Sequence, residues 1–185
     1  MKKALVIYAN GSEDMEVTAI TDVLSRGNVA VIKAAVADNG CTVSLAHGTT
    51  VICDKNILDC KDDYDVIAIP GGLTGATNCR NCDPLISMLK KQKQEKRLIA
   101  AICAAPGFVL AHHGLIIDEK ATGYPGCSDN IKNYTNKGVE ISDDHLIITG
   151  KGPAFAIDFA LTILKELQGE ESMQQVAKGM LLIEK

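Results

Sequence analysis

The sequence lacks any hydrophobic run long enough to cross a membrane, because its longest apolar segments have the length of a β-strand. It also lacks an excess of basic residues: 19 Lys and Arg stand against 23 Asp and Glu, for a net charge of -4. Proteins that bind nucleic acid usually show the opposite balance. No internal repeat and no glycine-rich nucleotide-binding fingerprint is found. These absences exclude a membrane span and argue against a specific nucleic-acid partner.

The start of the sequence is not expected to act as a secretory signal. The residues Met1-Lys2-Lys3 and the apolar run at 4–9 resemble one only superficially, because the run is short and no small-residue cleavage site follows it. A buried first strand explains these residues better. We therefore expect the protein to be cytoplasmic.

The cysteines do not form an even set. There are seven of them, scattered along the chain, whereas a secreted disulfide framework requires pairs. Most of these thiols are expected to be reduced and partly buried, with at least one kept for its reactivity. The seven positions are Cys41, Cys53, Cys60, Cys79, Cys82, Cys103 and Cys127.

What the chain does contain is typical of one globular domain. Its 185 residues suit a single core, and we expect one domain over residues 1–185. Short apolar runs alternate with helical patterns, which predicts an α/β fold. Strands are expected at 4–9, 29–37, 65–70, 98–102 and 145–149, a hairpin at 41–53, and helices at 14–26, 83–95, 103–112, 152–167 and 171–180.

Several of these strands are continuously apolar, which indicates burial on both faces. Strands alternating with helices then predict a doubly wound, mainly parallel sheet with helices on both faces. In such sheets ligands bind beyond the carboxyl ends of the strands. Three turns should therefore meet at one edge, namely residues 9–16, 70–75 and 102–107.

The most informative of these turns contains Cys103. A strand runs directly into a helix there, and only small residues surround the bend in AAICAAPG at 100–107. Such a turn resembles a nucleophile elbow, which presents one side chain above the sheet. The amino end of a helix favours a thiolate, so we expect the pKa of Cys103 to lie well below that of a free cysteine. The alternative is a core cysteine at the end of a strand.

The other two turns supply groups that suit a cysteine nucleophile. Gly71 and Gly72 follow a buried strand and could turn their N–H groups toward an oxyanion, although a simple tight turn is the alternative. Glu13, Asp14 and Glu16 surround the start of the first helix. The first two suit the helix dipole. Glu16 is placed to project toward the strand ends, where a carboxyl of raised pKa could donate a hydrogen bond to sulfur or act as a general acid and base.

No histidine is an obvious base for this constellation. His112 and His113 fall where the helix after Cys103 should end, and we interpret them as structural groups at that terminus. The Cys79-Arg80-Asn81-Cys82 spacing has no second matching pair, so we assign it neither a metal nor a redox role. Cys127 is expected on a loop, as an accessible secondary thiol. No metal or cofactor is expected.

Taken together, four segments resemble the DJ-1/ThiJ/PfpI superfamily, and specifically its DJ-1/ThiJ branch, over essentially the whole chain. They are GSEDMEV at 11–17, DVIAIPGG at 65–72, LIAAICAAPG at 98–107 and TGKGPAFAIDFAL at 149–161. The resemblance implies a flavodoxin-like sheet and a homodimer. It also implies that Cys103 is the nucleophile or the oxidation-sensitive thiol, and that Glu16 hydrogen-bonds it. Gly71, Gly72 and the backbone of Ala104 are implied to bind the oxyanion.

Members of that superfamily are described as cofactor-free methylglyoxal-converting enzymes, deglycases of glycated adducts, chaperones and sensors of oxidative stress. Two positions depart from the pattern. Ala104 replaces the histidine that follows the cysteine in the protease branch, which argues against peptidase activity. Tyr124 stands where several glyoxalase-active members have a histidine, and its phenol, with a pKa of about 10, is a poor base.

Three functional hypotheses stay open at this point. In the first, Cys103 attacks a small carbonyl such as methylglyoxal or glyoxal, Glu16 moves the proton, and Tyr124 lies at the substrate site. In the second, Cys103 is oxidised to a sulfinate, and the protein is a redox sensor or a redox-controlled chaperone without significant turnover. In the third, apolar residues of the first helix support a dimer or partner surface alone.

Overall fold

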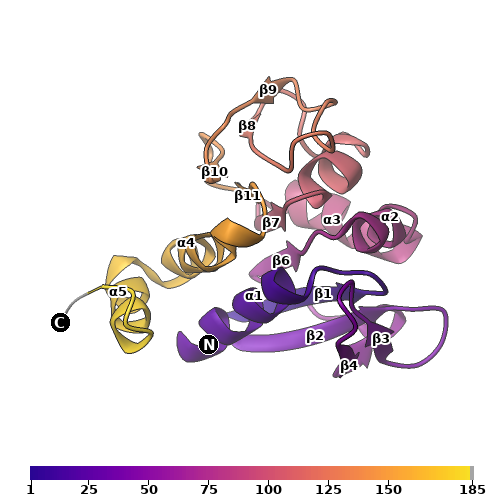
Figure 1. Cartoon of the computed structure of the whole chain (residues 1–185), viewed down its shortest axis with the longest axis horizontal. Coiled ribbons are helices and arrows are strands. Elements are labelled where there is room, and N and C mark those ends of the chain that lie inside the picture. Colours follow the sequence, from indigo (N-terminus) through magenta and orange to yellow (C-terminus); the bar gives the residue numbers. More distant parts are fainter. Residues whose placement is uncertain (184–185) are drawn as a thin grey trace.

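The computed structural model describes residues 1–183 and shows a mixed α/β molecule built on one sheet (Figure 1). Seven strands form that sheet in the order β10-β11-β7-β6-β1-β2-β5. Their bounds are β1 Lys3–Ala9, β2 Ala30–Val36, β5 Lys55–Asn56, β6 Val66–Ile69, β7 Leu98–Ile102, β10 Val139–Ile141 and β11 Ile147–Gly150. Two small two-stranded sheets stand apart from it: β3 Thr42–Ser44 with β4 Thr50–Ile52, and β8 Lys120–Ala121 with β9 Asn133–Tyr134.

All neighbouring strands of the large sheet are parallel except β10, which pairs antiparallel with β11. The five central parallel strands are β2, β1, β6, β7 and β11. Counted along the chain, their order across the sheet is 2-1-3-4-5, which is the flavodoxin-like order. The doubly wound, mainly parallel sheet predicted from the sequence is confirmed.

Helices cover the two faces of this sheet, namely α1 Asp14–Arg26, α2 Leu73–Arg80, α3 Asp83–Gln94 and α4 Ala156–Gln168, while α5 Glu170–Gly179 packs against α4. Alternate residues of β1 enter two separate cores, because successive side chains of a strand point to opposite faces. Val6 and Tyr8 pack with α1 and α4, whereas Leu5 and Ile7 pack with α3 and with the segment after Cys103. This double burial explains why β1 is continuously apolar. The apolar residues of α1, including Ile20 and Leu24, lie in the first core.

Helix α2, at Leu73–Arg80, is not among the helices expected from the sequence. Thr74, Gly75 and Thr77 are weak helix formers, and the helix carries little amphipathic pattern. The helix after Cys103 also differs from expectation: it is a π-helical segment at Pro106–Ala111 rather than an α-helix from residue 103. The late strand starts at Ile147 instead of 145, because His145 takes a left-handed turn conformation with φ of 58°.

The predicted hairpin is present as β3 and β4, and its tip rests on the turn that follows β1 (Figure 1). Gly11 N–H donates to Ser44 O at 2.8 Å, and Ala46 N–H donates to Ser12 O at 2.8 Å. Ser44 N–H also donates to Asn10 Oδ1 at 2.9 Å. The hairpin thereby holds the turn that leads into α1.

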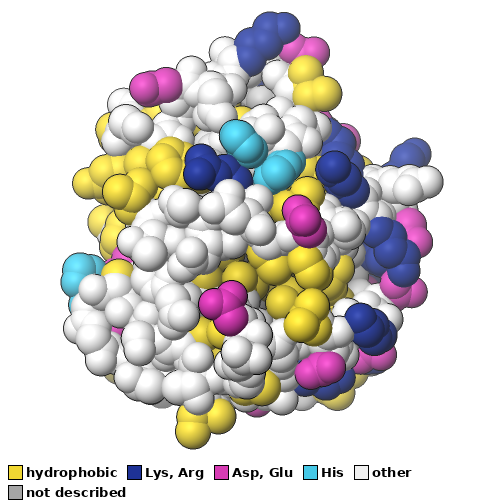
Figure 2. Space-filling view, turned by 90° about the vertical axis from the view of Figure 1, so that its right-hand side faces the viewer, with side chains coloured by type: hydrophobic (Ala, Val, Ile, Leu, Met, Phe, Trp, Pro, Cys, Tyr) yellow, Lys and Arg dark blue, Asp and Glu magenta, His cyan; other side chains and the backbone are white. Residues whose placement is uncertain are grey.

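The carboxyl ends of β1 and β2 point to one side of the molecule, which faces the viewer in Figure 2. On that side, hydrophobic side chains show between polar ones, and acidic, basic and histidine side chains are interspersed around them. Within residues 1–183, no helix is both long and apolar enough to cross a membrane.

Candidate active site

The three turns singled out in the sequence lie together at the carboxyl ends of β1, β6 and β7. These strands are neighbours in parallel register, so their ends share one edge of the sheet. Backbone hydrogen bonds join the turns to each other: Glu13 N–H donates to Gly71 O at 3.2 Å, and Gly75 N–H donates to Gly11 O at 3.1 Å. The sequence therefore brings three distant segments to one place, as the predicted fold required.

Cys103 sits in the expected elbow. It has φ of 66°, a left-handed conformation that is uncommon for a residue with a side chain. Two hydrogen bonds hold its backbone there: its N–H donates to Gly150 O at 2.8 Å, and its carbonyl accepts from Tyr124 N–H at 2.7 Å. The residue keeps 7% of its surface exposed.

Glu16 reaches the same place from the first turn of α1, and its side chain is fully buried. Its Oε2 accepts a hydrogen bond from Gly71 N–H at 2.7 Å. Its Oε1 has no hydrogen-bond partner among the described residues. The carboxyl lies close to the Cys103 thiol, because both border the space beside Gly71. The acid and the sulfur therefore form a buried pair.

Gly71 has to be a glycine because that pair fills the space beside it. A Cβ at Gly71 would lie 2.5 Å from Cys103 Cβ, 2.9 Å from Cys103 Sγ and 2.9 Å from Glu16 Oε2. Its N–H is committed to Glu16, which differs from the expectation that Gly71 donates to an oxyanion. Gly72 has φ of 79°, and a Cβ there would lie 2.2 Å from Gly11 O. The N–H groups of Gly72 and Ala104 point to the sulfur.

The charge state of the pair corrects one expectation. Burial raises the pKa of Glu16 to about 7, against the opposing effect of Gly71 N–H. The pKa of Cys103 is raised to about 12, mainly by burial and secondly by the negative charge of Glu16. The N–H groups of Gly72 and Ala104 lower this pKa, but by less. The expected depression of the thiol pKa was wrong. The π-helical segment starts only at Pro106, and its dipole does not outweigh burial beside an acid.

Tyr124 is tied to Cys103 through its backbone, and its side chain is 49% exposed. Its ring lies beside Gly152, where a Cβ would be 3.4 Å from it. The backbone of Tyr124 thus lies next to Cys103, and the role of its side chain at a substrate site stays a prediction. The close approach of Cys103 to Gly150 was not anticipated, although the Thr149-Gly150 pair belongs to one of the four segments quoted above.

The four histidines lie in structural or peripheral positions. His113 Nε2 lies 2.9 Å from Arg80 O, so it caps the end of α2 rather than its own helix. His145 pairs with Glu166 at 3.1 Å. His47, on the hairpin tip, lies 3.8 Å from Glu13 Oε1, and Glu13 Oε2 accepts from Glu16 N–H. The hairpin thus brings His47 close to Glu13, which in turn contacts the backbone of Glu16. The linear sequence gave no sign of this proximity.

The remaining cysteines fit the structural interpretation. Cys79 is fully buried on α2, and burial raises its pKa above the ordinary range. Cys82 precedes α3, and Cys127 is half-buried. Among residues 1–183, no three His, Cys, Asp or Glu side chains cluster so that they could hold a metal ion.

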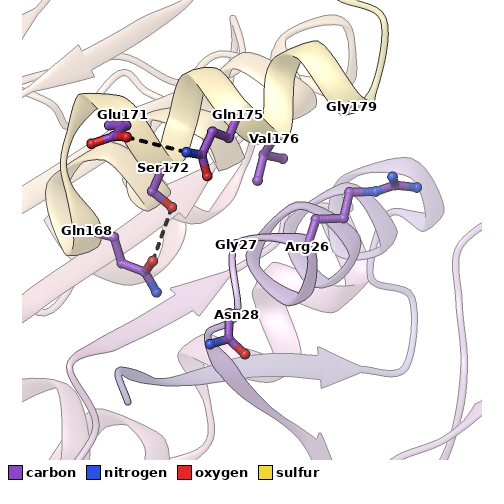
Figure 3. A pocket seen from close by; sticks show the side chains of 9 residues that line it. All are labelled: Arg26, Gly27, Asn28, Gln168, Glu171, Ser172, Gln175, Val176 and Gly179. Atoms are coloured by element: carbon purple, nitrogen blue, oxygen red, sulfur yellow. Dashed lines mark hydrogen bonds between the residues drawn. The ribbon is translucent and has the colours of Figure 1, made fainter.

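A separate groove of about 630 Å³ lies between the end of α1 and α5 (Figure 3). Its polar side chains bond to one another: Ser172 donates to Gln168 at 3.1 Å, and Gln175 donates to Glu171 at 3.5 Å. Its lining residues include no cysteine or histidine. The groove therefore offers neither a thiol nor an imidazole.

Comparison with known proteins shows the family of the chain. The sequence profile of the DJ-1/PfpI family matches residues 2–166. A zebrafish protein, Parkinson disease protein 7 homolog, is 36% identical over 98% of this chain and 97% of its own length. The Caenorhabditis elegans protein named glutathione-independent glyoxalase DJR-1.2 is 34% identical over 98% of this chain and 97% of its own.

Other relatives are longer, and one solved structure is very similar. The Arabidopsis protein DJ-1 homolog A is 36% identical over 98% of this chain, but the match spans only 47% of the plant protein. The structure of oxidized Toxoplasma gondii DJ-1 superposes with a TM-score of 0.94 at 39% identity, covering 98% of both chains. With matches of this extent on top of the Cys103–Glu16 elbow, the chain belongs to the DJ-1/PfpI family.

Proposed function

We propose that Cys103 converts small reactive carbonyls, such as methylglyoxal and glyoxal, to hydroxy acids without a cofactor. The observation that carries this proposal is the buried contact between the Cys103 thiol and the Glu16 carboxyl, at the ligand-binding edge of the sheet. A carboxyl whose pKa lies near 7 is matched to proton transfer at neutral pH. The relative named as a glyoxalase, at 34% identity, supports the same activity.

In the proposed chemistry the Glu16 carboxylate takes the proton of the Cys103 thiol while the sulfur adds to the aldehyde carbon of methylglyoxal, and this proton then passes to the aldehyde oxygen. The N–H groups of Gly72 and Ala104 face the sulfur and are placed to stabilise the oxygen that becomes negative. Glu16 then takes the proton of the former aldehyde carbon and returns it to the neighbouring carbonyl carbon, which leaves a thioester of lactate on Cys103. Water hydrolyses the thioester, so that methylglyoxal plus water gives lactate and the free thiol.

The test is lactate formation from methylglyoxal with no glutathione present. Wild-type protein should turn over, and Cys103→Ala should fall to background. Equal rates in the two proteins would remove the proposal. Early glycation adducts of amines are a second carbonyl-derived substrate class, and release of the amine in the same assay format distinguishes deglycation from free aldehyde conversion.

A second candidate function is oxidation sensing at the same sulfur. It is favoured by the donors around Cys103, which suit the oxygens of a sulfinate, and by a 39% identical relative whose structure is described as oxidized. Mild peroxide followed by intact-mass and peptide analysis tests it. If other cysteines gain oxygen before Cys103 does, this candidate fails.

Two further proposals concern the setting of the protein. We propose a homodimer, as the family resemblance implies, and sedimentation of the wild-type protein tests it. We also propose a cytoplasmic location, which is consistent with seven cysteines that are all free. Fractionation of the cells that make the protein would test that location.

A further inference from the structure

Cys41 and Cys53 stand opposite each other at the open end of the β3–β4 hairpin. The ladder pairs Thr42 with Ile52, Val43 with Val51 and Ser44 with Thr50. Continuing this register by one step pairs Cys41 with Cys53, and the chain makes that step: Cys53 N–H donates to Cys41 O at 2.7 Å. The two cysteines are therefore a hydrogen-bonded cross-strand pair.

This placement brings the two thiols within reach of a disulfide, and the Cβ atoms of such opposite residues, about 4.5–5.5 Å apart, must close to about 3.5–4.5 Å as the bond forms. Hydrogen-bonded pairs in antiparallel strands have Cα atoms about 5.5 Å apart. Disulfides join Cα atoms that are about 4.4–6.8 Å apart. Residues directly opposite in a ladder also point to the same face. Accordingly both side chains pack on the same hydrophobic core, Cys53 as a buried member and Cys41 as a partly buried neighbour.

We propose that Cys41 and Cys53 form a reversible disulfide that locks the base of the hairpin. Both thiols are free in the structure, and the two differ in access: Cys41 is half-buried, whereas Cys53 is 5% exposed. Cys41 is therefore the thiol that meets an oxidant first, and Cys53 is the resolving thiol.

The oxidant is a small disulfide such as glutathione disulfide. The Cys41 thiolate attacks one sulfur of it, which forms a mixed disulfide and releases one glutathione. The Cys53 thiolate then attacks the Cys41 sulfur and releases the second glutathione. Two protein thiols are oxidised and one glutathione disulfide is reduced to two thiols. Burial raises the pKa of Cys53 to about 11, so the second step should be slow near neutral pH and faster at higher pH.

Because the hairpin contacts the turn before α1, a disulfide between Cys41 and Cys53 would also affect that turn. The hairpin tip holds the turn before α1 through Ala46 N–H to Ser12 O and through His47 N–H to Asp14 Oδ2, both at 2.8 Å. Glu16 follows in the first turn of α1. A disulfide that closes the loop from 41 to 53 restricts opening of the hairpin, and so it stabilises the turn that carries Glu16. The inference does not rest on any particular reaction at Cys103.

The test equilibrates the full chain in glutathione buffers of increasing oxidised fraction, blocks the remaining thiols and identifies peptides by mass spectrometry. We expect a cross-linked peptide that joins Cys41 to Cys53 within one chain. Cys82→Ser, which leaves the pair intact, should keep this product, and Cys41→Ser should abolish it. The proposal is overturned if both thiols stay alkylatable in the most oxidising buffer, or if Cys53 is linked only between chains.

Hydrogen exchange tests the consequence separately. The amides of Ala46 and His47 should exchange more slowly in the oxidised protein, by about tenfold or more, because local opening of the hairpin is suppressed. In Cys41→Ser the same oxidant should leave these amides unchanged. If the disulfide forms without slowing them, the proposed lock on the turn is wrong.

Discussion

Gly71 donates its backbone N–H to Glu16 Oε2 at 2.7 Å, and the same residue leaves open the space that Glu16 and Cys103 share. One glycine thus orients the acid and makes room for the nucleophile. The pair that results is buried, so only one of its two acidic protons leaves easily. The following predictions concern this pair and the elements that hold it.

The first prediction concerns the reactivity of Cys103 as a function of pH. Glu16 loses its proton near pH 7, whereas the Cys103 thiol keeps its own until about pH 12. The alkylation rate of Cys103 should therefore keep rising with pH through the alkaline range, with no plateau above pH 7. In Glu16→Gln the negative charge that raises the thiol pKa is removed, so alkylation at pH 8 to 9 should be faster than in the wild type. Identical profiles in the two proteins would refute the effect of the Glu16 charge.

The second prediction adds a single methyl group at Gly71. In Gly71→Ala the new Cβ would overlap with Cys103 Cβ at 2.5 Å, so the sulfur and the acid must move apart. Turnover should fall by about 100-fold or more, because small displacements of reacting groups have effects of this size. Gly179→Ala is the matched control, since nothing lies within 4 Å of a Cβ there. Comparable kcat/KM in the two variants would contradict the role given to Gly71.

The third prediction concerns stability. Because the folded pKa of Glu16 is about 7 and its ordinary value is 4.5, the folded chain holds this proton more tightly than the unfolded chain. The contribution is fully present below pH 4.5 and is lost as pH rises through 7, and it amounts to about 3 kcal/mol. Denaturant unfolding of wild type and Glu16→Gln at pH 5 and pH 8 measures it. The wild type should lose more stability than the variant between these two values.

The fourth prediction separates the backbone of Tyr124 from its hydroxyl. The Tyr124 N–H holds the Cys103 carbonyl at 2.7 Å, and Tyr124→Phe keeps that bond. Because Glu16 carries the proton transfers in the proposed chemistry, loss of the hydroxyl should change kcat by less than about threefold. Tyr124→His adds a group that titrates near 6.5 and should raise kcat above that of the phenylalanine variant. A large loss in Tyr124→Phe would assign the hydroxyl a chemical role.

The fifth prediction concerns a histidine outside the chemistry. His113 Nε2 meets Arg80 O at 2.9 Å and satisfies a carbonyl at the end of α2. His113→Ala should lower the free energy of unfolding by about 1 kcal/mol and leave kcat unchanged. Thermal unfolding and turnover of the same preparation check both parts.

The sequence was enough to predict the sheet and the three turns, because continuous apolar runs indicate buried parallel strands and small residues indicate close approach. Cys103, Glu16 and Gly72 could be placed on that basis alone. Helix α2 could not, since Thr74 and Gly75 favour a loop locally and become helical through contacts with the Gly11–Ser12 turn. The contact of His47 with Glu13 depends on where a distant hairpin lands, which no local pattern specifies.

The pKa of Cys103 shows a second limit of prediction from sequence. A cysteine at the start of a helix indicates a stabilised thiolate, and that reasoning uses only neighbours along the chain. Burial and the charge of Glu16 act through space and oppose it, and their sum is larger. The type of reactive group was therefore predictable, whereas its ionisation required the three-dimensional neighbourhood.

The left-handed backbone of Cys103 has a consequence for how such a protein can change over evolutionary time. Residues other than glycine are disfavoured at a φ of 66° by about 1 kcal/mol or more. Replacing the nucleophile by glycine should therefore make the chain inactive and also more heat-resistant. Drift under selection for robustness alone would erase this cysteine, so its retention in a lineage requires continued use of the sulfur.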